Sequence, residues 1–390
     1  MIPRLLPIHE RPNIHSSFLL RKAEIHAISQ ILAADGDLMV AGVSGSGRRS
    51  LIQLAAQRVR AKVMEIDCLR ATTSSQFLTL LAEGLLAVFP DELALIEKIC
   101  CNFPLVIEKN SAQLPRLSWK VNQKEEWSIF QALLTFPQIM AEQLDCRVVF
   151  VFQNFPHIRS WDRSGQWEAY LRQEVQQQSR INYVILATVP EIWANDTNLK
   201  VMTLAPLQRE ELQEWLIDVM TAKGLKFQQD ALELFLDSVQ GHIGDAIALA
   251  RRLWLEYRVE ALGIEDWDSN ISLEKKTTSY PLPTNFAKNL IELHQVHRSI
   301  LALIQDLSQT FESLLLLLPP IQARVLESLA SDPTDSPHAK EYIHKHQLSK
   351  GGGLQGALLG LEQKGLIYGA KLGYRVALPL LALWLKQRLA

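Results

Sequence analysis

The stretch Val40-Ala41-Gly42-Val43-Ser44-Gly45-Ser46-Gly47-Arg48-Arg49-Ser50 decides the fold of this chain. It follows the pattern G-x-x-x-x-G-K-[ST], in which backbone N–H groups surround phosphates, the Lys contacts the outer phosphates and the hydroxyl binds magnesium. The spacing of the two outer glycines is kept, but Arg48 stands at the Lys position and Arg49 at the hydroxyl position. The candidate nucleotide-binding residues of this degenerate loop are Gly42, Ser44, Gly45, Ser46, Gly47, Arg48, Arg49 and Ser50.

The flanking sequence favours a true phosphate loop over a chance Gly/Ser-rich turn. An apolar run over Asp37–Ala41 ends at the first glycine, and Leu51–Arg58 continues with helical periodicity, which predicts the strand–loop–helix setting of the motif. Whether the loop binds nucleotide stays open. A guanidinium is a planar fork and not a compact charge, and Ser50 comes one residue late for magnesium, about 100° further around the helix.

A second strand is predicted at Arg147–Phe152, an uninterrupted β-branched and aromatic run typical of a buried parallel strand. In a working site this strand ends in an Asp that holds magnesium and an acid that polarises the attacking water. Here it ends in Gln153 and Asn154, a degenerate Walker B motif without charge. The alternative is an ordinary core strand with a polar end. We find no other strand-like run in the first 205 residues that ends in paired carboxylates.

With these motifs in place, the region Phe18–Arg252 resembles the AAA+ and archaeal-type P-loop ATPases that are related to replication initiators and to STAND ATPases. The resemblance implies an α/β parallel-sheet core, a helical lid and ATP or ADP as a possible ligand, with magnesium in doubt because its ligands are replaced. Further landmarks follow in order: the segment Phe18–Glu24 before the first strand, the second strand at Ala61–Asp67, the sensor strand at Ile181–Thr188 with Thr188 as the sensor-like residue, and the last strand and lid start at Lys200–Glu211.

The same resemblance exposes further losses. The segment Gln240–Ile247 is similar to the lid turn that leads into a second-sensor arginine, but Ile247 occupies roughly that place. Arg251 and Arg252 lie one turn later, and we interpret them as a solvated lid face. No Arg occurs in Pro190–Leu199, where ring-forming members of the family often carry an arginine finger. The pattern indicates a pseudo-ATPase, a switch fold without ATP hydrolysis.

At 390 residues the chain is long enough for two to four modules. We predict a P-loop core over residues 1–205, a helical lid over 206–257, a linker with bracing helices over 258–318 and a winged-helix domain over 319–390. The linker proper is Gly263–Asn285, and Phe286–Leu318 is a long amphipathic helical stretch.

The last module is predicted from three helical segments followed by two short alternating strands over Gly365–Val376 and a closing helix, Leu378–Lys386, similar to that of archaeal-type ATPases. A winged helix binds DNA or protein, and the fold does not decide which. From Pro319 on there are nine Lys or Arg residues against five Asp or Glu. The candidate DNA contacts are Lys350, Lys364, Lys371 and Arg375, which would bind phosphates with little sequence specificity.

Composition limits the remaining classes. A formal net charge of −2 with 21% charged residues does not mark a general polyanion binder. The four cysteines form no C-x-x-C pair, which predicts reduced thiols in a cytoplasmic protein, and no metal site is expected. No segment has the length of a membrane span.

Two functions from different classes follow. The first is a scaffold or adaptor that binds a protein partner, DNA or both through its lid and winged helix, with weakened nucleotide binding and no hydrolysis. The alternative is a slow ATPase or ATP-dependent switch acting on DNA, which would use Arg48 for phosphate and Ser50 or Thr188 for other roles. The sequence leaves the partner and the oligomeric state open.

Overall fold

The chain divides into two compact units. The computed structural model describes residues 20–109, 114–119, 126–175, 180–261, 289–348 and 351–389. The first unit, called here the sheet unit, comprises Lys22–Val43 and Gly47–Leu204. The second, the helical unit, comprises Leu20–Arg21, Ser44–Ser46 and the described residues from Ala205 onward. The three residues at the tip of the phosphate loop therefore belong by their contacts to the helical unit.

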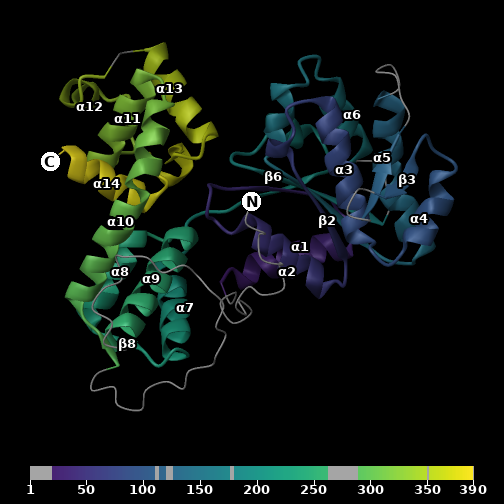
Figure 1. The fold of residues 1–390 in the computed structure, drawn as a ribbon. Coiled ribbons are helices and arrows are strands. Elements are labelled where there is room, and N and C mark those ends of the chain that lie inside the picture. Colours follow the sequence, from purple (N-terminus) through teal and green to yellow (C-terminus); the bar gives the residue numbers. More distant parts are fainter. Residues whose placement is uncertain are drawn as a thin grey trace. The chain divides into compact units, whose positions relative to one another are not determined.

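The sheet unit is built on a five-stranded sheet in the order β2-β5-β6-β1-β7 (Figure 1). All of its strand pairs are parallel. Parallel strands need crossover connections, which here are mostly helical. The strands are β1 Leu38–Ala41, β2 Lys62–Asp67, β5 Val148–Gln153, β6 Ile181–Ala187 and β7 Lys200–Thr203.

Side chains of the strands alternate between two apolar layers, as the period of two in a strand requires. Val149, Val151 and Val184 pack with helices α1 and α2 on one face, while Phe150 and Tyr183 pack with α3 and α5 on the other. The helices of this unit are α1 Lys22–Ala33, α2 Arg48–Arg58, α3 Ser74–Val88, α4 Leu93–Cys100, α5 Glu126–Gln143 and α6 Gln166–Glu174, with short 3₁₀ turns at Cys68–Arg70, Phe155–Ser160 and Ile192–Asp196.

A small antiparallel hairpin lies in the region between α4 and α5. It consists of β3, Val106–Lys109, and β4, Pro115–Ser118, with Ile107 opposite Leu117. We had not predicted strands in this part of the sequence, because its Pro, Ser and Lys residues obscure any alternation.

The helical unit begins with α7 Arg209–Thr221, β8 Lys226–Phe227, α8 Gln229–Val239 and α9 Ile243–Ala261. The predicted linker Gly263–Asn285 lies outside the described residues. After it, one prediction is wrong at its start: Leu290–Ile291 is not helical but forms strand β9, which pairs in parallel with β8. The helix, α10, begins at Leu293 and runs to Leu316, with Glu292 and Gln295 forming a capping box at its start.

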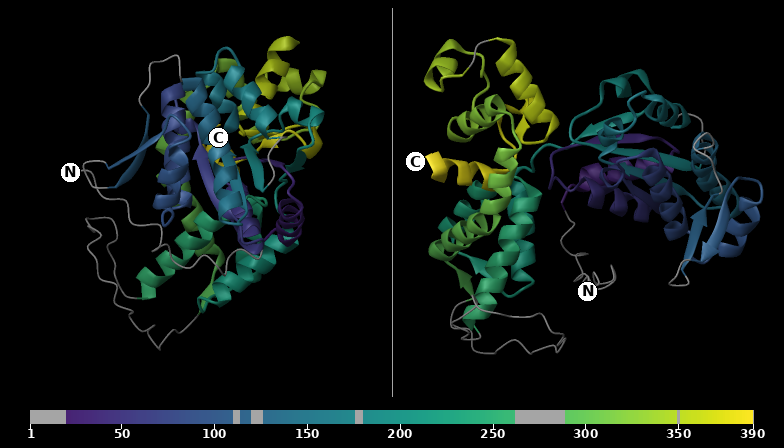
Figure 2. Two further views of the ribbon diagram at one scale, coloured as in Figure 1. Left: turned by 90° about the vertical axis from the view of Figure 1, so that its right-hand side faces the viewer. Right: turned by 45° about the horizontal axis from the view of Figure 1, so that its top comes forward.

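The last elements form a winged helix. They are α11 Pro320–Ser331, α12 Lys340–Lys345, α13 Gly352–Gln363, β10 Ile367–Tyr368, a 3₁₀ turn at Ala370–Leu372, β11 Arg375–Val376 and α14 Pro379–Leu389. Strands β10 and β11 pair antiparallel. One hydrophobic core runs through the helical unit, from Leu212 in α7 through Ile300 in α10 to Leu381 in α14. Figure 2 shows the helices of this unit, coloured from green to yellow, from two further sides. The fold thus combines a parallel-sheet unit, in which a glycine-rich loop joins β1 to α2, with a helical unit that ends in a winged helix.

Candidate functional site

The phosphate loop leads from β1 into α2. Gly45 has φ of 77° and Gly47 has φ of 88°, both in the left-handed region that glycine adopts without strain. Gly47 is the N-cap of α2 and gives its first turn no side-chain cap. The free N–H groups of such a turn and the positive end of the helix dipole favour an anion. The local backbone therefore has the form that a phosphate group needs.

Arg48, at the Lys position, is held on the sheet side of the loop. Its guanidinium donates to the carbonyl oxygen of Ala187, the last residue of β6, which also accepts the N–H of Gly42 at 3.1 Å. Burial lowers the pKa of Arg48, yet an Arg side chain keeps its charge in proteins. Among the described residues it has a carbonyl partner but no carboxylate in hydrogen-bond or ion-pair contact. It is a partly buried cation whose charge an anion would offset.

Arg49, at the hydroxyl position, forms its side-chain hydrogen bonds with strand β2. Its Nε and Nη2 atoms both donate to Glu65 Oε2, at 2.9 and 2.6 Å, and these hydrogen bonds are charge-assisted. The other oxygen of Glu65 accepts from the side-chain amide of Gln153. One carboxylate on β2 thus ties the residue that replaces the magnesium-binding hydroxyl to the residue that replaces the magnesium-binding Asp.

Asn154 has a similar arrangement one residue later. Its Nδ2 donates to Asp67 Oδ1 at 2.9 Å, and the same oxygen accepts the N–H of Leu69 at 3.1 Å. Asn154 itself has φ of 52°, a conformation in which Asn is enriched and Glu is not. The amide at this position therefore suits the turn, and its donor is satisfied by an acid.

Glu65 and Asp67, at the end of β2, were not predicted as site residues. They are separated by one residue, so they lie on the same side of β2 and are not adjacent in sequence. Their register opposite Val151 and Gln153 in β5 brings them to the carboxyl edge of the sheet. The available signal was the rule that parallel strands place functional side chains at that edge.

The remaining residues discussed from the sequence are Thr188, Ser50, Ile247 and Arg252. Thr188 directly follows β6 and is partly exposed, and Ser50 lies in the first turn of α2. Ile247 is 39% exposed on α9. Our interpretation of a solvated face is wrong for Arg252, which is half-buried and pairs with Glu256 and with Asp306 of α10.

The tip of the loop, Ser44–Ser46, contacts the turn before α9. His242 Nε2 lies 2.7 Å from the carbonyl oxygen of Ser44, and the N–H of Gly244 donates to the carbonyl oxygen of Gly45 at 3.0 Å. Ser46 is buried, and its hydroxyl has no hydrogen-bond partner among the described residues. A buried hydroxyl without a partner is costly unless a ligand or water completes it.

The described DNA-contact candidates on the winged helix, Lys364, Lys371 and Arg375, lie in different local surroundings. Lys350 lies outside the described residues. Lys364 donates to Gln322 Oε1 at 3.1 Å, and Lys371 is exposed in the wing. The described part of the recognition helix α13 carries no Lys or Arg. Its exposed positions are Gly352, Gly353, Gln355, Gly356, Leu359 and Gln363.

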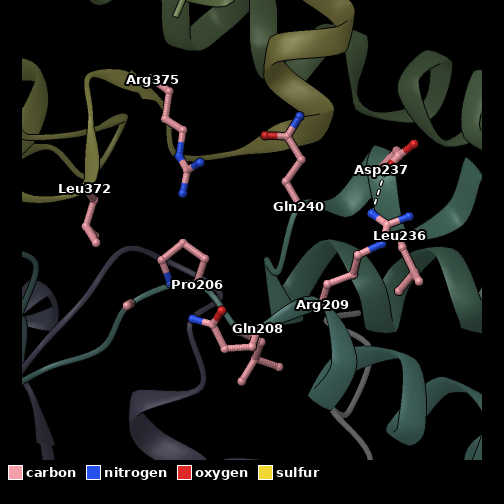
Figure 3. Close-up of a pocket in the computed structure, with 10 residues that line it drawn as sticks. Pro206, Gln208, Arg209, Leu236, Asp237, Gln240, Leu372 and Arg375 are labelled. Atoms are coloured by element: carbon pink, nitrogen blue, oxygen red, sulfur yellow. Dashed lines mark hydrogen bonds and ion pairs between the residues drawn. The ribbon is translucent and has the colours of Figure 1, made fainter. Parts of the chain in front are cut away.

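Arg375 lies at a pocket of about 550 Å³ within the helical unit. Figure 3 shows its side chain extending toward Pro206 and Gln208 at the start of α7. Its guanidinium carbon lies 5.4 Å from the centre of the Tyr368 ring. On the opposite side of the pocket Arg209 is neutralised by Asp237 and Glu233. Arg375 therefore faces a concave surface lined by both polar and apolar side chains.

Two findings limit other chemistry. No cluster of three or more metal-ligating side chains occurs among the residues that the structure describes. Among the described helices, none combines the length and the apolar character that crossing a membrane requires.

Comparison with known proteins supports the fold. Residues 309–387 match a family model described as "Probable winged helix domain". The Walker-type ATPase of Pyrococcus abyssi is similar in structure, with a TM-score of 0.60 and 14% identity over 94% of this chain and 95% of that one. The Aeropyrum pernix ORC1 protein in complex with DNA has a TM-score of 0.47 and 12% identity, covering 100% and 96% of the two chains. No protein of curated function matches the sequence. The chain therefore has the fold of a Walker-type, AAA+ P-loop ATPase with a C-terminal winged helix.

Proposed function

We propose that this protein is a non-hydrolysing P-loop scaffold: it holds a nucleotide phosphate without magnesium and presents its winged helix to a protein partner. The observation that carries the proposal is the contact of Glu65 with both Arg49 and Gln153. The two positions that would ligate magnesium are joined to each other through one carboxylate, and a cationic side chain already neutralises that carboxylate.

The phosphate half of the site supports binding. Left-handed Gly45 and Gly47, the uncapped start of α2, the hydroxyl of Ser46 and the cation of Arg48 are the kinds of groups that hold phosphate oxygens. Arg48 has further N–H donors beyond the one that contacts Ala187. ADP and ATP both present such oxygens, and neither needs a metal to be held by amides and a guanidinium.

The metal half of the site argues against hydrolysis. Phosphoryl transfer depends on positioned charge, with magnesium bridging the phosphates and an acid or amide orienting water. Arg49 offers no oxygen, and Gln153 offers an amide whose nitrogen is already donating to Glu65. Among the described residues, the loop thus offers groups suited to phosphate, and neither Arg49 nor Gln153 offers the charged oxygen that magnesium needs.

The winged helix favours a protein over DNA. DNA affinity comes mainly from phosphate contacts by Lys and Arg, and base reading needs polar groups that reach base edges. The described face of α13 offers Gln355 and Gln363 beside exposed Leu359. Depleted charge and an exposed aliphatic side chain are more typical of a protein interface. DNA stays the alternative partner.

The test is calorimetry with ADP and ATP in magnesium and in EDTA, together with a phosphate-release assay. We expect binding that is unchanged by EDTA, loss of binding of about tenfold or more in Arg48→Ala, and no release above background. Arg70→Ala, which alters an exposed ion pair with Glu83 in the same unit, is the control. Turnover that increases with magnesium and disappears in Arg48→Ala would establish the slow ATPase instead.

A further inference from the structure

We propose that His242 is a positioning residue for the phosphate loop and that Asp245 links it to the first turn of α14 in the winged helix. This assigns a regulation to the proposed nucleotide site, and in that respect it rests on the proposed function. All of the contacts concerned lie inside the helical unit, because Ser44–Ser46 belong to it.

The loop tip is held by its carbonyl oxygens. His242 Nε2 donates to Ser44 O at 2.7 Å, and the N–H of Gly244 donates to Gly45 O at 3.0 Å. Consecutive carbonyls are thereby fixed on one side of the chain. A phosphate loop works only when its N–H groups converge on the ligand, so fixing the carbonyls pre-arranges the donors.

The contact is close because glycines make it possible. A Cβ atom built on Gly45 would lie 2.6 Å from His242 Cε1, and one built on Gly244 would lie 3.1 Å from Gly45 Cα. His242 itself is only 4% exposed. An imidazole this buried, with both ring nitrogens in contact with polar groups, holds one orientation.

Asp245 engages the other side of the imidazole. His242 Nδ1 lies 3.1 Å from the backbone nitrogen of Asp245 and 3.1 Å from its Oδ1. The neutral ring accepts the backbone N–H, and the protonated ring donates to the carboxylate. In both states Nε2 carries the hydrogen that Ser44 O accepts. Burial lowers and the Asp245 carboxylate raises the pKa of His242, and the net shift is upward.

The second oxygen of Asp245 reaches the winged helix. Asp245 Oδ2 accepts the N–H of Leu380, the second residue of α14, at 3.1 Å. Ser44, His242, Asp245 and Leu380 therefore form a continuous path of hydrogen bonds from the loop tip to the start of the last helix. A ligand that fixes the loop would bias the same contacts at α14, and by reciprocity α14 would bias the loop.

The first experiment compares three variants by ADP calorimetry. His242→Leu removes the donor, and we expect about tenfold weaker binding, the value of one buried hydrogen bond. His242→Gln supplies a neutral donor and acceptor, and it should restore affinity to within about threefold. His294→Leu, at an imidazole that is 70% exposed in α10, is the matched control. Wild type and His242→Gln should share one pH profile, because Nε2 donates in both protonation states of the histidine.

The second experiment needs no nucleotide. Hydrogen exchange measured by mass spectrometry should become faster in the peptide covering Ser44–Gly47 and in the peptide covering Leu380 when His242 is changed to Leu. Asp245→Ala should accelerate exchange at Leu380 and also at the loop. Adding ADP to wild type should slow exchange at both places.

The outcomes separate the two proposals. If wild type binds ADP but His242→Leu binds it equally well, the positioning role is overturned and the proposed function stands. If wild type binds neither ADP nor ATP, the proposed function fails, and loop exchange in the ligand-free variants still decides whether His242 orders the loop. Unchanged exchange at Leu380 in His242→Leu would overturn the link to α14.

Discussion

The end of strand β5 and the exposed positions of α13 both carry uncharged side chains, but the two regions differ in their surroundings. At the sheet edge, every replacement has an internal partner: Arg49 and Gln153 share Glu65, and Asn154 binds Asp67. On α13, a Cβ atom built on Gly352 or Gly356 would meet nothing within 4 Å, and Leu359 is 55% exposed. In the first region the side chains are paired with one another, whereas in the second they are exposed.

The largest expected effect comes from restoring the Lys and the magnesium ligands at the loop and at the end of β5. Arg48→Lys, Arg49→Ser and Gln153→Asp together supply the compact cation and two magnesium ligands, and Arg49→Ser also frees Glu65. Asn154 is left unchanged because its φ of 52° disfavours Glu. We expect ATP to bind roughly 100-fold more tightly in magnesium than in EDTA, about 2.7 kcal/mol.

Calorimetry of the triple variant checks this gain, with wild type as the reference for the ratio between magnesium and EDTA. If the triple variant folds but binds ATP equally well in magnesium and in EDTA, Gly42–Gly47 is not a phosphate loop.

The second-largest expected effect is on stability, and it tests the contacts of Glu65 with Arg49 and Gln153. Glu65→Ala leaves Gln153 without an acceptor and Arg49 without its carboxylate, and we expect a loss of about 2 kcal/mol in the free energy of unfolding. Arg49 is 53% exposed, so solvent screening reduces its share. Urea denaturation of Glu65→Ala beside Glu83→Ala, whose ion pair is exposed on both sides, gives the comparison. Equal urea midpoints in the two variants would contradict a stabilising role for the contacts of Glu65.

Substitutions on the exposed face of α13 should reduce the amount of protein partner that is recovered. Leu359→Ser with Gln355→Glu changes the exposed face of α13 and leaves the core unaltered, and we expect about tenfold weaker capture of the protein partner with unchanged stability. Lys386→Glu on α14 is the control. Co-purification followed by mass spectrometry identifies what is captured, and undiminished capture by the double variant would move the interface elsewhere.

The smallest expected effect is on DNA. The fourfold variant Lys350→Ala, Lys364→Ala, Lys371→Ala and Arg375→Ala should change duplex affinity by less than about threefold, because the described helix α13 carries no Lys or Arg and wild type should bind weakly. Gel shifts at several salt concentrations measure this. A steep salt dependence in wild type whose slope falls by about 0.9 per lost contact would instead establish phosphate binding by the wing.

Much of the fold could be predicted from the sequence because local signals were strong. The run Val148–Phe152 is apolar on both faces, and the glycine-rich loop stands between an apolar run and a helical pattern. Leu290–Ile291 was predicted wrongly as helix, since two residues carry no periodicity and only pairing with Lys226–Phe227 makes them a strand. Hairpin β3–β4 was missed because Pro, Ser and Lys residues obscure the alternation of its strands.

At the candidate site, too, the sequence and the tertiary structure decided different features. The sequence by itself determined which chemical groups are absent at the loop and at the end of β5, because those positions are fixed by spacing along one strand or one helix. Only the tertiary structure decided what replaced them. Glu65 meets Gln153 through strand register, and His242 meets Ser44 across 198 positions of sequence. Such contacts depend on chain packing, and no local pattern encodes them.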